Sequence, residues 1–276
     1  MTTKEARAKA EPVPRPVLVT YRVWATPLEV AGGAAELFVS AATAAVEARG
    51  VARIAVSGGT TPKAMFALLA DKSAPYFARV PWDRLHLFFV DERCVPPTDD
   101  ESNYKMTNEA MLSKVPLPAA QIHRMEGELE PEVAASRYEA EIRTEFRLEG
   151  AEAPVFDLVL LGMGDDGHTA SLFPHTQALF EMVRLAVANQ VPQKETWRIT
   201  LTWPVIDRGR EVAFLIEGAG KARVLDDVLL GAYDPEAKPS QLIRPASGKL
   251  TMLLDSAAAA KLPATGTDGV GTLELS

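Results

Sequence analysis

The sequence has a single cysteine, Cys94, among 276 residues. One cysteine excludes an intramolecular disulfide and is typical of a reducing compartment, so we expect a cytoplasmic protein. No stretch approaches the roughly 18 consecutive apolar residues of a membrane span. The charges near the start of the chain are not followed by an apolar core, so no secretory signal is expected. The sequence therefore predicts no membrane contact.

Positive charge is also scarce. The chain has 29 Lys and Arg against 37 Asp and Glu, a formal net charge of −8. An acidic chain lacks the general basic surface that nucleic-acid binding requires, so no nucleic-acid partner is expected. Such a chain can still bind a phosphorylated metabolite, provided that it gathers positive charge locally.

Motifs for metal ions and nucleotides are missing as well. No two of the four histidines stand at i, i+4 spacing and there is no cysteine pair, so no metal site is predicted. The loop Ser57–Lys63 lacks the spacing of a P-loop. The glycines of 162–167 formally match a dinucleotide fingerprint, but Asp165 and Asp166 would stand where a pyrophosphate needs N–H donors. Pro174 also cuts short the helix that should follow, so no cofactor is expected.

Predicted strands and helices alternate from about Val17 to Leu254, with no internal repeat and no linker. This order predicts an α/β fold with a doubly wound, mostly parallel sheet flanked by helices, similar to a Rossmann fold. We expect a flexible N-terminal arm over residues 1–16, a single α/β domain over 17–262 and a flexible C-terminal tail over 263–276. The less regular segment 116–127 suggests a small subdomain or a lid. A monomer or weak homodimer is expected.

The most informative stretch is an apolar run, 156–161, that stops in glycines, two carboxylates and a histidine. The run has the composition of a buried parallel strand. In open α/β sheets, ligands bind at the carboxyl ends of the strands. Asp166 can hold the imidazole of His168 in orientation and raise its basicity, as a general base requires. The other histidines, His86, His123 and His175, have no such setting and are interpreted as structural.

Two further strand ends carry polar loops. Ser57, Gly58, Gly59 and Thr60 precede a predicted helix, where free N–H groups and the helix dipole favour an anion. The loop is either a phosphate cradle or a plain strand-to-helix turn. The second loop is 91–93. There Arg93 could bind a phosphate or an oxyanion while Asp91 fixes Arg93 or binds a sugar hydroxyl, or the three charges could form only an edge ion-pair set.

Two cations come from later in the chain. Arg198 opens a predicted strand, and Lys221 starts a predicted helix after two glycines. Each alone is typical of a surface cation. On the same sheet edge, facing the glycine loop, they would suggest a phosphate site. Cys94 has no histidine beside it in sequence and is interpreted as incidental.

Several segments together resemble 6-phosphogluconolactonases. These are Ser57–Pro62, Val90–Arg93, Ser102–Tyr104 and Gly162–Pro174, with Arg198–Thr202 and Gly220-Lys221 following in the same order. The glucosamine-6-phosphate deaminases are similar, but they typically follow the histidine with Ile-Ala-Phe-Asn-Glu-Pro. This chain has Thr-Ala-Ser-Leu-Phe-Pro over 169–174 and lacks that glutamate, which favours the lactonase.

The resemblance implies hydrolysis of 6-phosphoglucono-δ-lactone to 6-phosphogluconate, in the oxidative pentose phosphate pathway and without a cofactor. His168 would activate water, Asp166 would orient the site around it, and Arg93 would bind phosphate or polarise the carbonyl. The Ser57–Thr61 loop, Arg198 and Lys221 would hold the phosphate. Two alternatives stay open: a glucosamine-6-phosphate deaminase or isomerase, and a non-catalytic sugar-phosphate sensor. Such sensors carry a DNA-binding module, for which this chain offers no basic helix-turn-helix segment.

Overall fold

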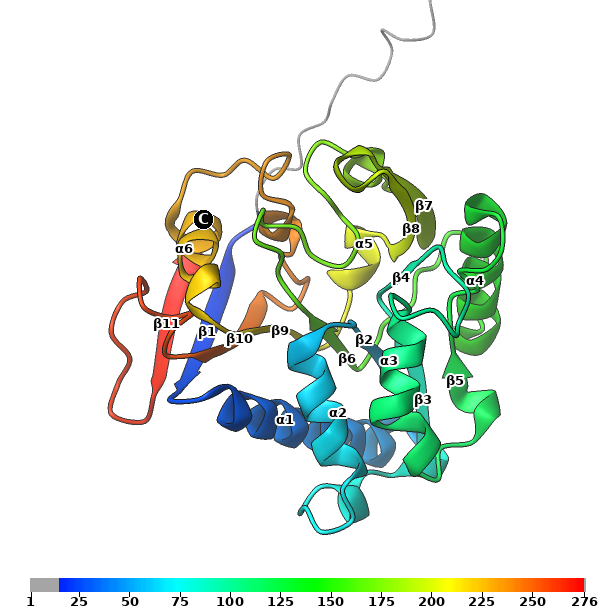
Figure 1. Ribbon diagram of the computed structural model, residues 1–276, viewed down its shortest axis with the longest axis horizontal. Helices are drawn as coiled ribbons and strands as arrows, with labels where there is room; N and C mark the ends of the chain where they lie inside the picture. Colours follow the sequence, from blue (N-terminus) through cyan, green and yellow to red (C-terminus); the bar gives the residue numbers. More distant parts are fainter. Residues whose placement is uncertain (1–14, 276) are drawn as a thin grey trace, which may run out of the picture.

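The computed structural model describes residues 15–275. Its main sheet has eight strands in the order β11-β1-β10-β9-β6-β2-β3-β5. Every neighbouring pair is parallel except β1 with β11. This confirms the predicted mostly parallel sheet (Figure 1). The strands are β1 (Val17–Trp24), β2 (Ala52–Val56), β3 (Leu85–Phe89), β5 (Ile122–His123), β6 (Leu158–Leu161), β9 (Val212–Ile216), β10 (Lys249–Asp255) and β11 (Val270–Leu275).

The predicted flexible C-terminal tail, 263–276, is wrong for most of its length. β11 pairs antiparallel with β1, from Val17 opposite Leu275 to Arg22 opposite Val270. The glycines that suggested a frayed end instead build the turn before β11, because the N–H of Gly266 donates to the carbonyl of Val270. The strand covers the outer edge of β1, which would otherwise present unpaired backbone groups.

The predictions for residues 1–16 and 116–127 have different outcomes. Residues 1–14 lie outside the described residues. At the end of that predicted arm, Arg15 forms an ion pair of 3.2 Å with the buried carboxylate of Asp207. The segment 116–127 is not a lid, because it contains β5, which pairs with β3 and extends the main sheet.

Helices cover both faces of the sheet (Figure 1). Residues on β6 alternate between the two cores: Leu158 and Leu160 pack with the residues of α1 and α2, and Val159 and Leu161 pack with those of α4 and α6. All four are buried, as expected for a central parallel strand. The helices are α1 (Pro27–Arg49), α2 (Thr60–Ala70), α3 (Asn103–Ala110), α4 (Pro131–Phe146), α5 (Trp203–Ile206) and α6 (Ala222–Leu230).

The longest helix, α1, has strong local signals at both ends. Thr26 caps its N-terminus in a reciprocal capping box with Glu29, and Gly50 ends it in a left-handed conformation with φ 77°. Within residues 15–275, α1 alone has the length and apolar composition to cross a membrane. Half of the relevant window is buried inside the fold, as in the core helix of a folded domain.

A second, antiparallel sheet of three strands has the order β4-β8-β7. Its strands are β4 (Asp91–Arg93), β7 (Ala186–Val191) and β8 (Thr196–Leu201). Arg198 therefore lies inside a strand of this small sheet, not at the end of a strand of the main sheet as predicted. Its cross-strand partner is Arg93. Antiparallel pairing was not foreseen because β4 has only three residues and directly follows β3.

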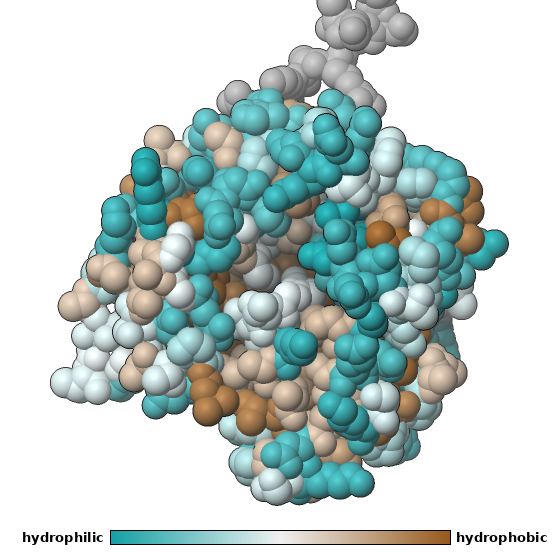
Figure 2. All heavy atoms as spheres, viewed as in Figure 1, coloured by the Kyte–Doolittle hydropathy of each residue, from teal (hydrophilic) through white to brown (hydrophobic). Residues whose placement is uncertain are grey.

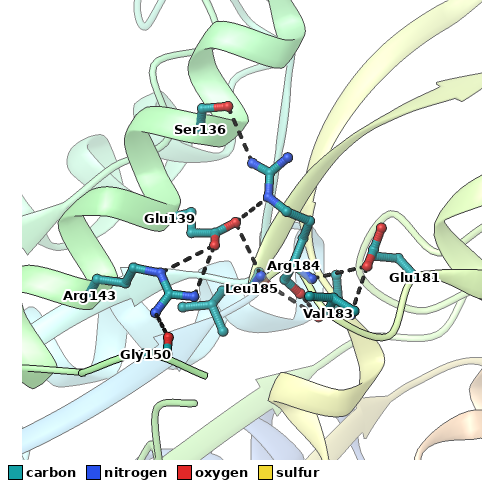
Figure 3. Close-up of polar contacts among 9 residues, drawn as sticks. Ser136, Glu139, Arg143, Gly150, Glu181, Val183, Arg184 and Leu185 are labelled. Carbon is teal, nitrogen blue, oxygen red and sulfur yellow. Dashed lines mark hydrogen bonds and ion pairs between the residues drawn. The ribbon is translucent and has the colours of Figure 1, made fainter. Parts of the chain in front are cut away.

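The small sheet is anchored to α4 by a polar network (Figure 3). Glu139 on α4 accepts hydrogen bonds from Arg184 Nε at 2.5 Å and from the N–H of Leu185 at 3.3 Å, just before β7 begins. Arg143, one turn later on α4, also donates to Glu139. These contacts fix the small sheet against the main body and so fix the strands that border the pocket described next.

Candidate active site

A pocket of about 480 Å³ opens where the loops after β2, β4 and β6 meet. The strand order reverses direction between β2 and β6, which is where open α/β sheets bind ligands. The face drawn in Figure 2 is hollowed near its centre, and hydrophilic residues lie along the upper and right-hand rim of that hollow. The pocket is lined by Ser57, Gly58, Asp91, Arg93, Glu101, Asn103, Gly162, Met163, Gly164, His168, Ala170, Ser171, Phe173, Lys194 and Arg198.

The loop after β6 places His168 by a tight turn. The N–H of Gly164 donates to the carbonyl of His168 at 2.8 Å, which closes the loop on itself. A Cβ atom at Gly164 would lie 2.0 Å from His168 Nδ1, so only glycine allows the imidazole this position. The hydroxyl of Thr169 donates to the carbonyl of Gly162 at 2.8 Å and ties the loop to the end of the strand.

The imidazole of His168 is held by a carboxylate. Its Nδ1 lies 2.5 Å from Asp166 Oδ1, and that oxygen also accepts the His168 backbone N–H at 3.0 Å. The ring stacks on Phe173 with centroids 4.0 Å apart. Burial acts to raise the pKa of Asp166, but the hydrogen bonds and charge of His168 outweigh it and lower this pKa to about 2. Asp166 is therefore an anion at neutral pH, and His168 Nε2 is left for a ligand in the pocket.

The acidic residues after β3 have structural partners. The carboxylate of Glu92 accepts the backbone N–H groups of Asn103 at 2.7 Å and Tyr104 at 2.8 Å, at the N-terminus of α3. Asp91 accepts the hydroxyl of Ser171 at 2.7 Å and joins β4 to the His168 loop. Glu92 is thus a helix cap, while Asp91 also lines the pocket, and its contact with a sugar hydroxyl stays a prediction.

Among the residues that the structure describes, three cations line the pocket, namely Arg93, Lys194 and Arg198. Arg93 and Arg198 stand directly opposite each other in the antiparallel ladder. Burial, and then the charge of Arg93, lower the pKa of Arg198. Like charges at such positions destabilise a sheet, so this pair favours a bound anion that compensates them.

Ser57 offers a further group for a ligand. Its side chain is buried and lines the pocket, and its Oγ has no hydrogen-bond partner among residues 15–275. Buried hydroxyls are nearly always paired, so an unpaired one at a pocket wall points to a bound polar molecule. The neighbouring Gly58 is required by sterics, because a Cβ atom there would lie 1.9 Å from Asn103 Oδ1.

The structure brings most, but not all, of the predicted site residues together. Ser57, Gly58, Asp91, Arg93, His168 and Arg198 share one pocket. Gly59 is the N-cap of α2 and Thr60 its first residue, outside the lining. Lys221 pairs with Asp165 at 2.5 Å and does not line the pocket either. Phosphate binding by these three residues stays a prediction.

Lys194 and Asn103 are two of the polar lining residues that were not predicted as site residues. Lys194 lies in a short 3₁₀ turn between β7 and β8, where no sequence pattern marks it. Asn103 donates from Nδ2 to the carbonyl of Asp91 at 2.9 Å, and it stands in a segment, 102–104, that already carried the family resemblance. Cys94 does not line the pocket, and burial raises the pKa of its thiol to about 11, which makes it a poor nucleophile.

Comparisons with known proteins agree on one family. The sequence pattern described as glucosamine-6-phosphate isomerases/6-phosphogluconolactonase matches residues 25–252. A 6-phosphogluconolactonase of Synechocystis is 43% identical over 222 residues, covering 80% of this chain and 88% of its own. The solved 6-phosphogluconolactonase of Trypanosoma cruzi is 32% identical with a TM-score of 0.75, over 88% of this chain and 97% of that one. A solved monomeric glucosamine-6-phosphate deaminase, 18% identical with a TM-score of 0.71 over 87% and 98%, shares the fold.

Proposed function

The chain belongs to the family of glucosamine-6-phosphate isomerases and 6-phosphogluconolactonases, and we propose that it hydrolyses 6-phosphoglucono-δ-lactone to 6-phosphogluconate, a step of the oxidative pentose phosphate pathway. The relatives named above as 6-phosphogluconolactonases support the reaction. The observation that carries the proposal is the His168–Asp166 pair, 2.5 Å apart, with His168 at the wall of a pocket that Arg93, Lys194 and Arg198 also line.

A lactone is an activated ester, so its hydrolysis needs a positioned water and a base but no covalent nucleophile. In the proposed mechanism, His168 Nε2 takes a proton as water oxygen adds to the lactone carbonyl carbon. The carbonyl oxygen becomes an oxyanion, which a nearby cation stabilises. Collapse of this intermediate breaks the bond to the ring oxygen, and imidazolium returns the proton to that oxygen. Asp166 stabilises the imidazolium between the two transfers.

We assign the phosphate of the substrate to the cations that line the pocket. Arg93 and Arg198 present two guanidinium groups from adjacent strands, and Lys194 lies in the turn that leads into β8. The unpaired Ser57 hydroxyl and the N-terminus of α2 suit the same anion. Arg93 can instead meet the carbonyl oxygen, in which case the other two cations hold the phosphate.

Two assays run in parallel separate the three candidate functions. The first measures the rate at which the protein hydrolyses freshly made lactone, with the spontaneous opening subtracted. The second measures ammonia release from glucosamine 6-phosphate. We expect lactone turnover without ammonia release, and His168→Ala should lose about 10²–10⁴-fold in rate. Ammonia release would establish the deaminase, and 6-phosphogluconate binding without turnover would establish the sensor.

We also propose a cytoplasmic location and a monomeric or weakly dimeric state. The single cysteine supports the first, since it needs no oxidising compartment. Sedimentation at increasing protein concentration tests the second, and a stable higher oligomer would contradict it.

A further inference from the structure

Away from the pocket, three side chains of metal-binding type meet at the edge of the main sheet. His86 lies on β3, His123 on the edge strand β5, and Glu145 in the last turn of α4. Each offers one ligand atom, and these atoms lie within 4.8 Å of one another. His86 Nδ1 is 2.9 Å from His123 Nε2 and 3.4 Å from Glu145 Oε1.

We propose that this cluster binds Zn²⁺ or another divalent transition metal ion, through His86 Nδ1, His123 Nε2 and the Glu145 carboxylate. Zinc–ligand distances of about 2.0–2.1 Å separate two ligands of a tetrahedral site by roughly 3.3 Å. The His86–Glu145 distance already has this value, and the two imidazole nitrogens need to separate by only a few tenths of an ångström. Two imidazoles and a carboxylate are a common ligand set for zinc.

The surroundings of His123 support this assignment. Its other ring nitrogen, Nδ1, lies 2.7 Å from Glu141 Oε1, one turn before Glu145 on α4. A carboxylate on the second nitrogen is the usual outer partner of a metal-binding histidine, because it directs the Nε2 lone pair to the ion. The His123 ring is buried and stacks on Phe88 with centroids 4.1 Å apart, so its orientation is fixed before a metal arrives.

The positions of the protons on the two imidazole rings leave His86 Nδ1 able to bind a metal ion. With Nδ1–H of His123 donated to Glu141, the hydrogen bond between the imidazoles is donated by His86 Nδ1. On metal binding this proton moves to His86 Nε2, so no proton need leave the pair. The His86 side chain is 19% exposed, which leaves a path for the ion.

Arg53 opposes binding of a metal ion, so its replacement gives a discriminating test of the proposal. Its Nε and Nη2 donate to Glu145 Oε1 at 3.1 and 2.9 Å. The guanidinium competes for this carboxylate and repels a cation. Arg53→Gln should therefore tighten metal binding, whereas Glu141→Gln should weaken it by about 10–100-fold, as outer carboxylates do. Misfolding does not produce this pair of opposite effects.

The experiment titrates the full chain with Co²⁺ alone and follows the visible absorption that marks tetrahedral coordination, with Zn²⁺ added afterwards to displace it. We expect one equivalent to bind, and His86→Gln and His123→Gln each to weaken binding at least about tenfold. His175→Gln and His168→Gln serve as controls, one at an exposed site and one in the pocket, and should bind as the unaltered chain does.

Binding of a metal ion should also change the thermal stability of the protein. Because the ion would join β3, β5 and α4, Zn²⁺ should raise the thermal midpoint of the unaltered chain and not that of His86→Gln. No saturable binding, or binding that persists in His86→Gln and disappears in His168→Gln, would overturn the proposal. Since the readouts are absorbance and melting, they are independent of lactone hydrolysis.

Discussion

Two histidine–carboxylate pairs in this protein can be compared directly. In the pocket, His168 Nδ1 lies 2.5 Å from Asp166, and at the sheet edge His123 Nδ1 lies 2.7 Å from Glu141. In both pairs the carboxylate is bound by Nδ1 of the imidazole. The surroundings of the second ring nitrogen differ, because His168 borders a pocket of about 480 Å³ whereas His123 Nε2 faces the imidazole of His86.

The difference teaches that a carboxylate partner alone does not give a histidine its role. The surroundings of the other ring nitrogen determine the role of the histidine. An open pocket lined by cations favours proton transfer on a phosphorylated substrate, whereas a second imidazole beside a carboxylate favours a bound metal ion. Under the two proposals above, the same histidine–carboxylate arrangement serves two different chemistries in one protein. The predictions below alter matched members of the two pairs.

The largest effect is expected from replacing the two histidines themselves. His168→Gln should lower lactone turnover about 10²–10⁴-fold, since the general base is lost. His86→Gln should keep turnover within about twofold, because it lies outside the pocket. Initial rates of both variants, corrected for spontaneous hydrolysis, make the comparison. Equal losses in the two would show that the pocket does not distinguish them.

The carboxylates form the second matched pair. Asp166→Asn should lower kcat by about 10–150-fold, which corresponds to the loss of a charge-assisted hydrogen bond of about 1.5–3 kcal/mol. The pKa of Asp166 is depressed to about 2, so it is protonated only as the pH falls through that value. The loss should therefore be constant on the alkaline side of the rate profile, where the general base is unprotonated in both enzymes, as rate profiles of both would show. Glu141→Gln is the control and should retain turnover.

Arg198 and Lys221 test which cations bind the phosphate. Arg198→Met should raise KM about tenfold or more with a smaller change in kcat, because it removes one charge-assisted contact made throughout the reaction. Lys221→Gln should change KM less, since Lys221 pairs with Asp165 and lies outside the pocket lining. Steady-state kinetics separates the two, and a larger KM effect for Lys221 would show that Lys221, which the sequence also predicted to bind the phosphate, contributes more than Arg198.

Cys94→Ser should have the smallest effect. Burial raises the pKa of the thiol to about 11, so the thiol ionises only as the pH rises towards that value. At pH 8 about one thiol in a thousand would then be the reactive thiolate. Turnover should stay within about twofold, and labelling by iodoacetamide at pH 8 should be slow. Loss of turnover in this variant would indicate that the Cys94 thiol acts as a covalent nucleophile.

The two pairs also show what sequence can predict. Asp166 and His168 stand two residues apart after an apolar run, so a local pattern marked both the strand and the site. His86 and His123 are 37 residues apart and meet only because β5 joins β3. Rules based on the sequence spacing of metal ligands therefore could not indicate the site proposed here.

The strands of the two sheets likewise differ in how well local sequence patterns predict them. The parallel strands were predictable from buried apolar runs, whereas β11 was missed because its glycine-rich approach resembled a frayed end. Lys194 enters the pocket from a turn of the small antiparallel sheet, whose pairing depends on contacts distant in sequence.

The most direct test of the central claim is the pH dependence of kcat for lactone hydrolysis, measured in the unaltered chain and in His168→Gln. We predict that kcat of the unaltered chain falls tenfold per pH unit on the acid side, because a general base that has gained a proton can no longer accept one from water. This acid limb should be absent from the residual activity of His168→Gln. The same limb in both proteins would contradict the assignment of His168 as the general base.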